Sequence, residues 1–172
     1  MRDDVRDDVR VRPATPADAP ALAGLRWTFR ASLGTPVEGE ATFTARCAAW
    51  MAARLGDAGA WRAWVAESPD GAIVGTAWVG LVDKIPNPTV EAEHHAYISN
   101  VYVRPEWRGG TGSALVAAAL AWCESASVHA VVLWPTERSA ALYRRHGFAE
   151  PAALLERELG PGPERGDRER AS

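Results

Sequence analysis

One segment in the second half of the chain limits the possible folds more than any other. Residues 95–103 read as a β-strand, residues 109–112 contain three glycines, and residues 114–125 are alanine-rich and helical in pattern. A continuous apolar run at residues 128–133 follows, which predicts a second strand buried on both faces. A strand, a glycine turn, a helix and a strand in this order predict a parallel crossover unit and therefore an α/β fold.

The segments on either side extend this unit into a larger sheet. Each has the residue period of a strand or a helix and is bounded by Gly, Pro or a capping residue. We predict strands at 9–13, 61–67, 72–82 and 154–159, and helices at 16–32, 41–55 and 137–146. The turn Ser68-Pro69-Asp70-Gly71 joins two of these strands into a hairpin. One mixed sheet with helices on both faces is expected.

The length of 172 residues fits one domain with short tails. Residues 1–8 repeat the charged unit Arg-Asp-Asp-Val, and residues 160–172 are rich in Gly, Pro and charge, so both ends are predicted to be disordered. The domain is therefore expected to span residues 9–159. Because the charged N-terminus has no apolar stretch, a secretory signal is not expected.

Charge and cysteine usage exclude several classes of protein. The formal net charge of −3 gives no electrostatic reason to expect binding to nucleic acid or to an anionic membrane. No apolar run approaches the roughly 18 residues of a membrane span. Cys47 and Cys123 lie far apart, which predicts two reduced thiols in a cytoplasmic protein, with no disulfide framework and no metal site.

The glycine turn has the chemistry of a phosphate site. Glycines lack Cβ, so an anionic group can approach the backbone, and the first amides of the following helix have no internal partners. The helix dipole adds partial positive charge, and Arg108 adds a cation. The residues predicted to contact the phosphates are Arg108, Gly109, Gly110, Thr111, Gly112 and Ser113. The alternative is a tight turn that only packs the helix against the sheet.

The turn differs from two common nucleotide-binding motifs. A GxxxxGK[ST] loop is absent because no Lys follows the glycines. The dinucleotide fingerprint G-x-G-x-x-G is incomplete because Leu115 occupies its third glycine position. A nucleotide-dependent α/β protein nevertheless remains an alternative at this point.

Two phrases together carry a family resemblance. Residues 103–112 read Val-Arg-Pro-Glu-Trp-Arg-Gly-Gly-Thr-Gly, and residues 142–148 read Leu-Tyr-Arg-Arg-His-Gly-Phe. In this order, with one strand between them, they resemble the two acetyl-CoA motifs of the GCN5-related N-acetyltransferase (GNAT) superfamily. The resemblance covers about residues 9–159. It implies a mostly antiparallel central sheet with one splayed parallel pair of strands and helices on both faces.

The resemblance also has departures. In the family's phosphate loop, [Q/R]-x-x-G-x-[G/A], the first position aligns with Trp107, and Arg108 comes one residue late. Thr136 and Ser139 stand where the family often has Asn and Ala. They are included among the expected cofactor contacts.

The resemblance implies a mechanism for residues 101–103 and Tyr143. Backbone groups of Val101, Tyr102 and Val103 would pair with the pantetheine arm as an added strand does. The amide of Val101 would polarise the thioester carbonyl, and Tyr143 would protonate the departing thiolate.

The general base and the acceptor pocket are less defined. The candidates for the base are Glu91, Glu93, His94, His95 and, through a water, Ser99 or Asn100, with Glu93 and His95 preferred. Pocket walls are expected from the first two helices, the hairpin and the loop 83–93, with Trp27, Phe43, Trp50 and Trp78 as candidates. The loop acids Asp83, Glu91 and Glu93 either attract a cationic amine or are simply solvated.

The predicted function is transfer of an acetyl group from acetyl-CoA to a primary amine of a small molecule or peptide, by direct attack on the thioester. The alternatives are a non-catalytic acyl-CoA-binding domain on the same fold and the nucleotide-dependent protein. A homodimer is compatible with the sequence.

Overall fold

The computed structural model describes residues 8–56, 59–150 and 157. The strands are β1 (Arg10–Pro13), β2 (Trp61–Glu67), β3 (Ile73–Asp83), β4 (His94–Val103) and β5 (Ala130–Val132). The α-helices are α1 (Ala19–Ala31), α2 (Glu40–Gly56), α3 (Thr111–Ser125) and α4 (Ala140–Arg145). Single 3-10 turns lie at Pro16–Asp18, Pro105–Trp107 and Glu137–Ser139.

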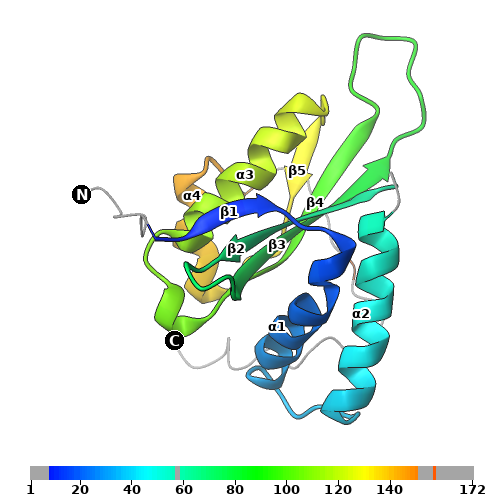
Figure 1. The fold of residues 1–172 in the computed structure, drawn as a ribbon. Helices are drawn as coiled ribbons and strands as arrows, with labels where there is room; N and C mark the ends of the chain where they lie inside the picture. The colour runs from blue at the N-terminus through cyan, green and yellow to red at the C-terminus, as the bar shows by residue number, and fades with distance from the viewer. Residues whose placement is uncertain (1–7, 57–58, 151–156, 158–172) are drawn as a thin grey trace.

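The five strands form one sheet in chain order, β1-β2-β3-β4-β5 (Figure 1). The first three pairings are antiparallel, and β4 and β5 are parallel. The predicted mixed sheet with one parallel pair is therefore confirmed. The β2–β3 turn also has its predicted geometry, because Gly71 has a φ of 83° and its N–H donates to the Ser68 carbonyl over 2.8 Å.

Helices cover both faces of the sheet, α1 and α2 on one and α3 and α4 on the other (Figure 1). Alternate residues of β2 divide between two cores, as the period of a strand requires. Ala63 and Val65 pack with α1 and α2, whereas Trp64 and Ala66 pack on the side of α3. The predicted helices on both faces are confirmed, and the two sides of the sheet are built independently.

Two elements differ from their predicted form. The third α-helix begins at Thr111 and not at residue 114, because Gly110 serves as its N-cap with a φ of 91°. β5 has only three residues, all half-buried, so the prediction of a strand buried on both faces is wrong. Among the described strands β5 is at the edge, and it pairs with β4 alone.

Some predictions fall outside the described residues. The final strand at 154–159 and the two tails at 1–8 and 160–172 lie almost wholly there, so they and the domain limits remain predictions.

The side chain of Arg12 connects β1 to the 3-10 turn that precedes α1 and to the adjacent strand β2. Its guanidinium donates to Asp18 at 2.8 and 2.9 Å and to Glu67, on β2, at 2.7 Å. The hydrogen bond from Arg12 lowers the pKa of Asp18 to about 2. This network fixes the start of the α1 layer to the edge of the sheet.

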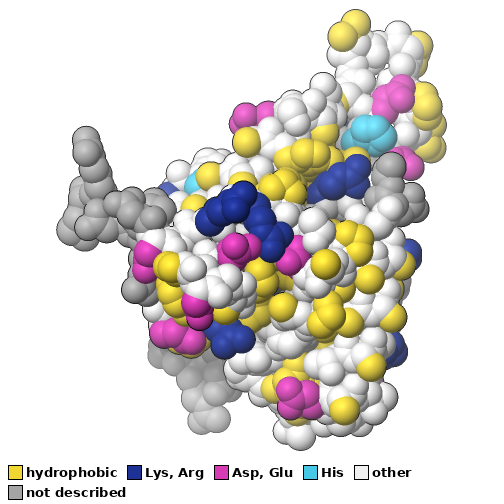
Figure 2. All heavy atoms as spheres, in the orientation of Figure 1, with side chains coloured by type: hydrophobic (Ala, Val, Ile, Leu, Met, Phe, Trp, Pro, Cys, Tyr) yellow, Lys and Arg dark blue, Asp and Glu magenta, His cyan; other side chains and the backbone are white. Residues whose placement is uncertain are grey.

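The surface on the viewed side is mixed in charge. Figure 2 shows basic and acidic side chains close together among apolar ones, with no broad area of one sign. Within the described part of the chain, no helix is long and apolar enough to cross a membrane.

Candidate active site

The centre of β4 contains a bulge. Between the pairs Trp78–Ser99 and Thr76–Tyr102, one residue of β3 faces two residues of β4, Asn100 and Val101. Asn100 adopts a φ of 50°, in the left-handed region, where Asn is among the more tolerant side chains. The bulge releases backbone groups of β4 from the regular ladder at this point.

The same part of β4 has an unpaired edge on its other side. The β4–β5 pairing covers only His95–Ala130, Ala96–Val131 and Tyr97–Val132. Beyond Tyr97, β4 continues to Val103 with no described strand on that side. The parallel pair therefore separates as the resemblance implied, and residues 101–103 lie where an extended ligand could add to the strand.

The start of α3 lies just beyond the end of β4. Gly109 and Gly110 have φ values of 99° and 91°, which side chains rarely adopt, and a Cβ on Gly109 would meet nothing within 4 Å. No side chain caps the helix. The first amides of α3, at residues 111–113, thus face an open glycine turn, which is the geometry of an anion site.

Two of the residues predicted for this site have additional structural roles. The Thr111 hydroxyl donates to the Trp107 carbonyl over 2.7 Å and is buried. A Cβ at Gly112 would lie 3.6 Å from Leu142 and 3.9 Å from Val103. Gly112 therefore faces the packing of α4 and β4 against α3, so its absent side chain also serves helix packing.

Sequence reasoning missed a contact that links the two motifs. The Ser113 hydroxyl and Nε2 of His146 are 2.8 Å apart, joining the first turn of α3 to the end of α4. Burial, followed by the charge of Arg145, lowers the pKa of His146, which favours the neutral ring. Neither residue alone suggests this pairing, because 33 positions separate them in the chain.

Tyr143 is buried on α4, and its ring meets the edge of Phe148 at a centroid distance of 5.7 Å. Burial raises the pKa of its phenol, and nearby Tyr97 raises it further. A phenol with a raised pKa keeps its proton at neutral pH, which suits a proton donor.

The structure places neither preferred base candidate directly at the bulge. Glu93 is exposed and precedes β4, eight residues from Val101, which is roughly 26 Å of extended chain. His95 shares the strand face of Tyr97 and Ser99, and its Nδ1 is buried without a hydrogen-bond partner among the described residues. Its ring lies 5.4 Å from that of His129.

Thr136 and Ser139 form a capping pair at the turn before α4. The Thr136 amide donates to the Ser139 hydroxyl over 2.9 Å, and the two hydroxyls are 3.0 Å apart. Their polar groups thus stabilise the entry to α4; Thr136 is exposed and Ser139 is half-buried.

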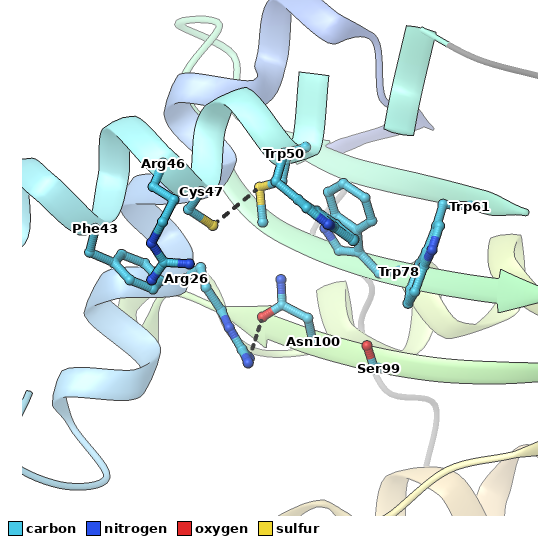
Figure 3. A pocket seen from close by; sticks show the side chains of 10 residues that line it. Arg26, Phe43, Arg46, Cys47, Trp50, Trp61, Trp78, Ser99 and Asn100 are labelled. Atoms are coloured by element: carbon cyan, nitrogen blue, oxygen red, sulfur yellow. Dashed lines mark hydrogen bonds between the residues drawn. The ribbon is translucent and has the colours of Figure 1, made fainter. Parts of the chain in front are cut away.

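A cavity of about 300 Å³ opens on the opposite side of the bulge (Figure 3). It lies between α1, α2 and the sheet, and Ser99 and Asn100 form part of its wall. The remaining lining residues are Arg26, Phe43, Arg46, Cys47, Trp50, Met51, Trp61 and Trp78. The site thus has a backbone-lined edge on one side of β4 and a side-chain-lined cavity on the other.

The cavity corrects part of the predicted acceptor pocket. Phe43, Trp50 and Trp78 do line it, but Trp27 instead packs on Phe43 with a centroid distance of 5.7 Å. The loop acids are absent from the lining: Glu91 pairs with Lys84, and Asp83 bonds to His94. Arg26 and Trp61 were not predicted, because helix and strand patterns do not reveal which side chains meet across a sheet.

A comparison with protein families agrees with this geometry. The profile of the acetyltransferase (GNAT) family matches residues 26–148. The chain belongs to the GNAT family. It is therefore an N-acetyltransferase, and the acetyl donor of the family is acetyl-CoA. This assignment replaces the nucleotide-dependent and non-catalytic alternatives.

One curated relative and several solved structures resemble this acetyltransferase. The relative is an aminoglycoside N(6')-acetyltransferase type 1 from Stenotrophomonas maltophilia, 36% identical over 118 residues, covering 67% of this chain and 68% of that protein. A GCN5-related N-acetyltransferase from Ralstonia eutropha superposes with a TM-score of 0.71 at 25% identity, covering 88% of this chain and 99% of the other.

A predicted acetyltransferase from Clostridium acetobutylicum, solved with acetyl-CoA, has a TM-score of 0.71 at 22% identity, covering 88% and 96% of the two chains. At this identity the likeness shows the fold alone.

The residues of this acetyltransferase fit acetyl-CoA. The start of α3, which no side chain caps, and the open turn at Gly109 suit a diphosphate, and the unpaired edge of β4 suits the amides of a pantetheine arm. Among the described residues, no group of three or more His, Cys, Asp or Glu could hold a metal ion.

Proposed function

We propose that this enzyme acetylates a primary amine of a small molecule or peptide by direct attack on the thioester of acetyl-CoA. The observation that carries the proposal is the position of the cavity. It meets β4 at Ser99 and Asn100, beside the bulge residue Val101 and across the strand from the unpaired edge. An amine in the cavity and a thioester at that edge would meet at the bulge.

The transfer balances with the groups available. Bound acetyl-CoA supplies an activated acetyl group. The amine nitrogen forms the amide bond to the carbonyl carbon, and the carbon–sulfur bond breaks. The proton lost by the amine passes to a base and solvent, and the leaving thiolate takes a proton from Tyr143.

The residues around the bulge have distinct proposed roles. The Val101 amide donates a hydrogen bond to the carbonyl oxygen as negative charge develops there. Val101, Tyr102 and Val103 hold the pantetheine arm through backbone groups. Tyr143 is the general acid, supported by its raised pKa and its burial near Tyr97.

The start of α3 is proposed to hold the diphosphate. Backbone amides of this turn would make the contacts, with Arg108 as a nearby cation. The proposed residues are Arg108, Gly109, Gly110, Thr111, Gly112 and Ser113. Thr136 and Ser139 would contribute through the turn that they cap.

Of Glu93 and His95, the proposed general base is His95. It lies on the same strand face as Ser99, and its Nδ1 has no protein partner among the described residues. Because four residues separate it from Ser99, roughly 13 Å of strand, the proton would pass through water. The exposed Glu93 is retained only as a more distant acceptor of that proton.

The curated relative is named for transfer to an aminoglycoside 6'-amine, so such an amine is one acceptor to be tested. The experiment that tests transfer covers this candidate as well. Purified enzyme is incubated with acetyl-CoA and each member of a panel of amines, and release of free CoA thiol is followed. We expect amine-dependent thiol release, whereas tight acetyl-CoA binding with no amine acetylated would contradict transfer.

A further inference from the structure

Among the described residues, arginines and no carboxylates line the cavity at the bulge. Arg26 and Arg46 line it, and no Asp or Glu of the described residues does. Arg46 is at the rim, 65% exposed, and pairs with Glu38. The charge that meets a ligand in this cavity is therefore cationic.

Arg26 is the unusual member of this group. It is half-buried, and no carboxylate among the described residues lies within ion-pair distance of it. Its guanidinium donates one hydrogen bond of 3.2 Å from Nη1 to the Asn100 side-chain oxygen. Burial, and then the charge of Arg30, lower its pKa, as expected for a cation without a counter-ion.

The other end of the cavity is aromatic. Trp50, Trp61 and Trp78 pack with centroid distances of 5.4, 6.0 and 6.3 Å. In Figure 3 these three rings lie to one side of Asn100, and Arg26 and Phe43 lie to the other. The Nε1 of Trp78 is buried and has no partner among the described residues, so its N–H is a hydrogen-bond donor without an acceptor there.

We propose that the acceptor is an amino carboxylate with an apolar, preferably aromatic, side group. Its carboxylate binds Arg26, its amine lies beside Ser99 and Asn100, and its side group packs against the tryptophans. This inference rests on the proposed acetyl transfer, and it specifies the substrate class for the same site.

The geometry suits a carboxylate close to the reacting amine. Arg26 bonds directly to Asn100, and Asn100 belongs to the bulge at which the amine would react. An anion on Arg26 and an amine at the bulge are thus near each other, as they are in an α-amino acid. The cavity volume of about 300 Å³ is at the small end of ligand pockets, which suits a molecule with one or two rings.

The same features disfavour a polycationic aminosugar. Such a ligand would place several ammonium groups next to Arg26 with no lining carboxylate to compensate them. The substrate named for the 36%-identical relative is therefore not expected to be the preferred acceptor of this chain.

The test compares matched acceptors on the full chain. Thiol release from acetyl-CoA is measured with L-phenylalanine, with phenethylamine, which lacks the carboxylate, with L-alanine, which lacks the ring, and with kanamycin. We expect kcat/KM for phenylalanine to exceed that for phenethylamine by roughly 10- to 100-fold, the contribution of a charge-assisted hydrogen-bond pair. Alanine and kanamycin should also be poorer acceptors than phenylalanine.

Variants of α1 assign this preference to one side chain. Arg26→Gln should bring the phenylalanine-to-phenethylamine ratio to within about 3-fold, and Arg26→Lys should give an intermediate ratio because it keeps the charge but loses the planar fork. Arg30→Gln is the matched control, since Arg30 is exposed on the next turn of the same helix, and it should keep the wild-type ratio. Calorimetry with CoA confirms that each variant is folded.

A binding readout separates this inference from acetyl transfer. Phenylalanine is titrated with CoA present while tryptophan fluorescence is recorded, and Arg26→Gln should weaken binding by roughly 10- to 100-fold. If no amine is acetylated but this Arg26-dependent binding is found, the anion site stands and the proposed transfer falls. Equal or better use of phenethylamine or kanamycin by the wild type, an unchanged ratio in Arg26→Gln, or no binding of phenylalanine would each overturn the inference.

Discussion

The two sides of β4 offer different chemistry to a ligand. On the α3 side the proposed site consists of backbone: the open glycine turn, the start of the helix, which no side chain caps, and an unpaired strand edge. On the α1 and α2 side it consists of side chains, chiefly Arg26 and three tryptophans. Main-chain geometry suits the proposed cofactor site, whereas the proposed selection of an acceptor depends on the side chains of the cavity.

This difference predicts where substitutions act. Changes on the α3 side or at Tyr143 should affect every acceptor equally, because they alter acetyl-CoA binding or the chemical step. Changes on the α1 and α2 side should alter the ratio between acceptors and leave acetyl-CoA affinity unchanged. The following predictions test that division.

The largest effect is expected from Tyr143→Phe. Loss of a general acid should lower kcat by roughly 10²- to 10⁴-fold for every acceptor, with little change in acetyl-CoA affinity. Because burial raises the phenol pKa, the wild-type rate should fall only above about pH 10, and the variant should lack this limb. Thiol-release kinetics against pH and calorimetry with CoA measure both quantities.

Tyr97→Phe is the matched control for the phenol. Tyr97 influences the pKa of Tyr143, and its ring packs on Trp134 at 5.1 Å, so the substitution keeps the aromatic packing. A large loss in this variant with a normal rate in Tyr143→Phe would transfer the role of the acid to Tyr97.

A smaller but still large effect is expected from Ser113→Glu. Two charges 4 Å apart at an effective dielectric of 20 interact by about 4 kcal/mol, so repulsion of the diphosphate should raise the Kd for acetyl-CoA at least about 100-fold. An acidic residue in the first turn favours the helix itself, so folding should be retained. Calorimetry measures the Kd.

Two controls accompany this substitution. Ser113→Ala removes only the contact to His146 and should weaken binding less than about 10-fold. Ser125→Glu adds the same charge at the other end of α3, about 18 Å away and beyond the screening length, and should leave the Kd unchanged. An unaltered Kd in Ser113→Glu would remove the diphosphate from this turn.

Much of the α3 side could be predicted from sequence because its determinants are local. Glycines at 109 and 110 and the phrase around Tyr143 mark the turn and the fourth helix directly in the chain. Even there, the sequence pattern predicts the start of α3 three residues too late. Gly110 caps the helix with a positive φ, and this conformation is not evident from the residue pattern.

The acceptor side could be predicted only in outline. Aromatic walls from the first two helices were expected, but Arg26 meets Asn100 across 74 positions of the chain. Such a contact depends on how α1 packs on the bulge, and no residue period encodes it. For the same reason the sequence leaves open whether the loop acids attract an amine or are solvated, since it does not show that Glu91 pairs with Lys84.

A moderate effect on stability is expected from Asp18→Asn, which breaks the network that joins the α1 layer to β1. Its depressed folded pKa, about 2 against 3.8, means that the ionised carboxylate stabilises the fold above pH 3.8. With allowance for partial exposure, the variant should lose about 1–2 kcal/mol at pH 7. The difference from wild type should shrink as pH falls from 3.8 towards 2, because both proteins then carry a neutral side chain.

Urea unfolding at pH 7 and at pH 3 measures this difference. Neither acetyl-CoA affinity nor the acceptor ratio should change, since Asp18 lies in neither site. A stability difference that grows on acidification would contradict the assigned role of the Arg12–Asp18 pair.

The smallest effect expected is none: no covalent acetyl-enzyme should form. Direct transfer needs no nucleophile from the protein, and the thiols are poorly suited to be one. Burial raises the pKa of Cys47, which lines the cavity with its sulfur 3.9 Å from that of Met51, and burial raises that of Cys123 to about 11. Both thiols are therefore protonated at neutral pH.

Intact mass spectrometry after incubation with acetyl-CoA and no acceptor should show unmodified protein. An acetyl adduct that disappears in Cys47→Ala but persists in Cys123→Ala would replace direct attack with a two-step transfer. The cavity would then supply a catalytic nucleophile in addition to selecting the acceptor.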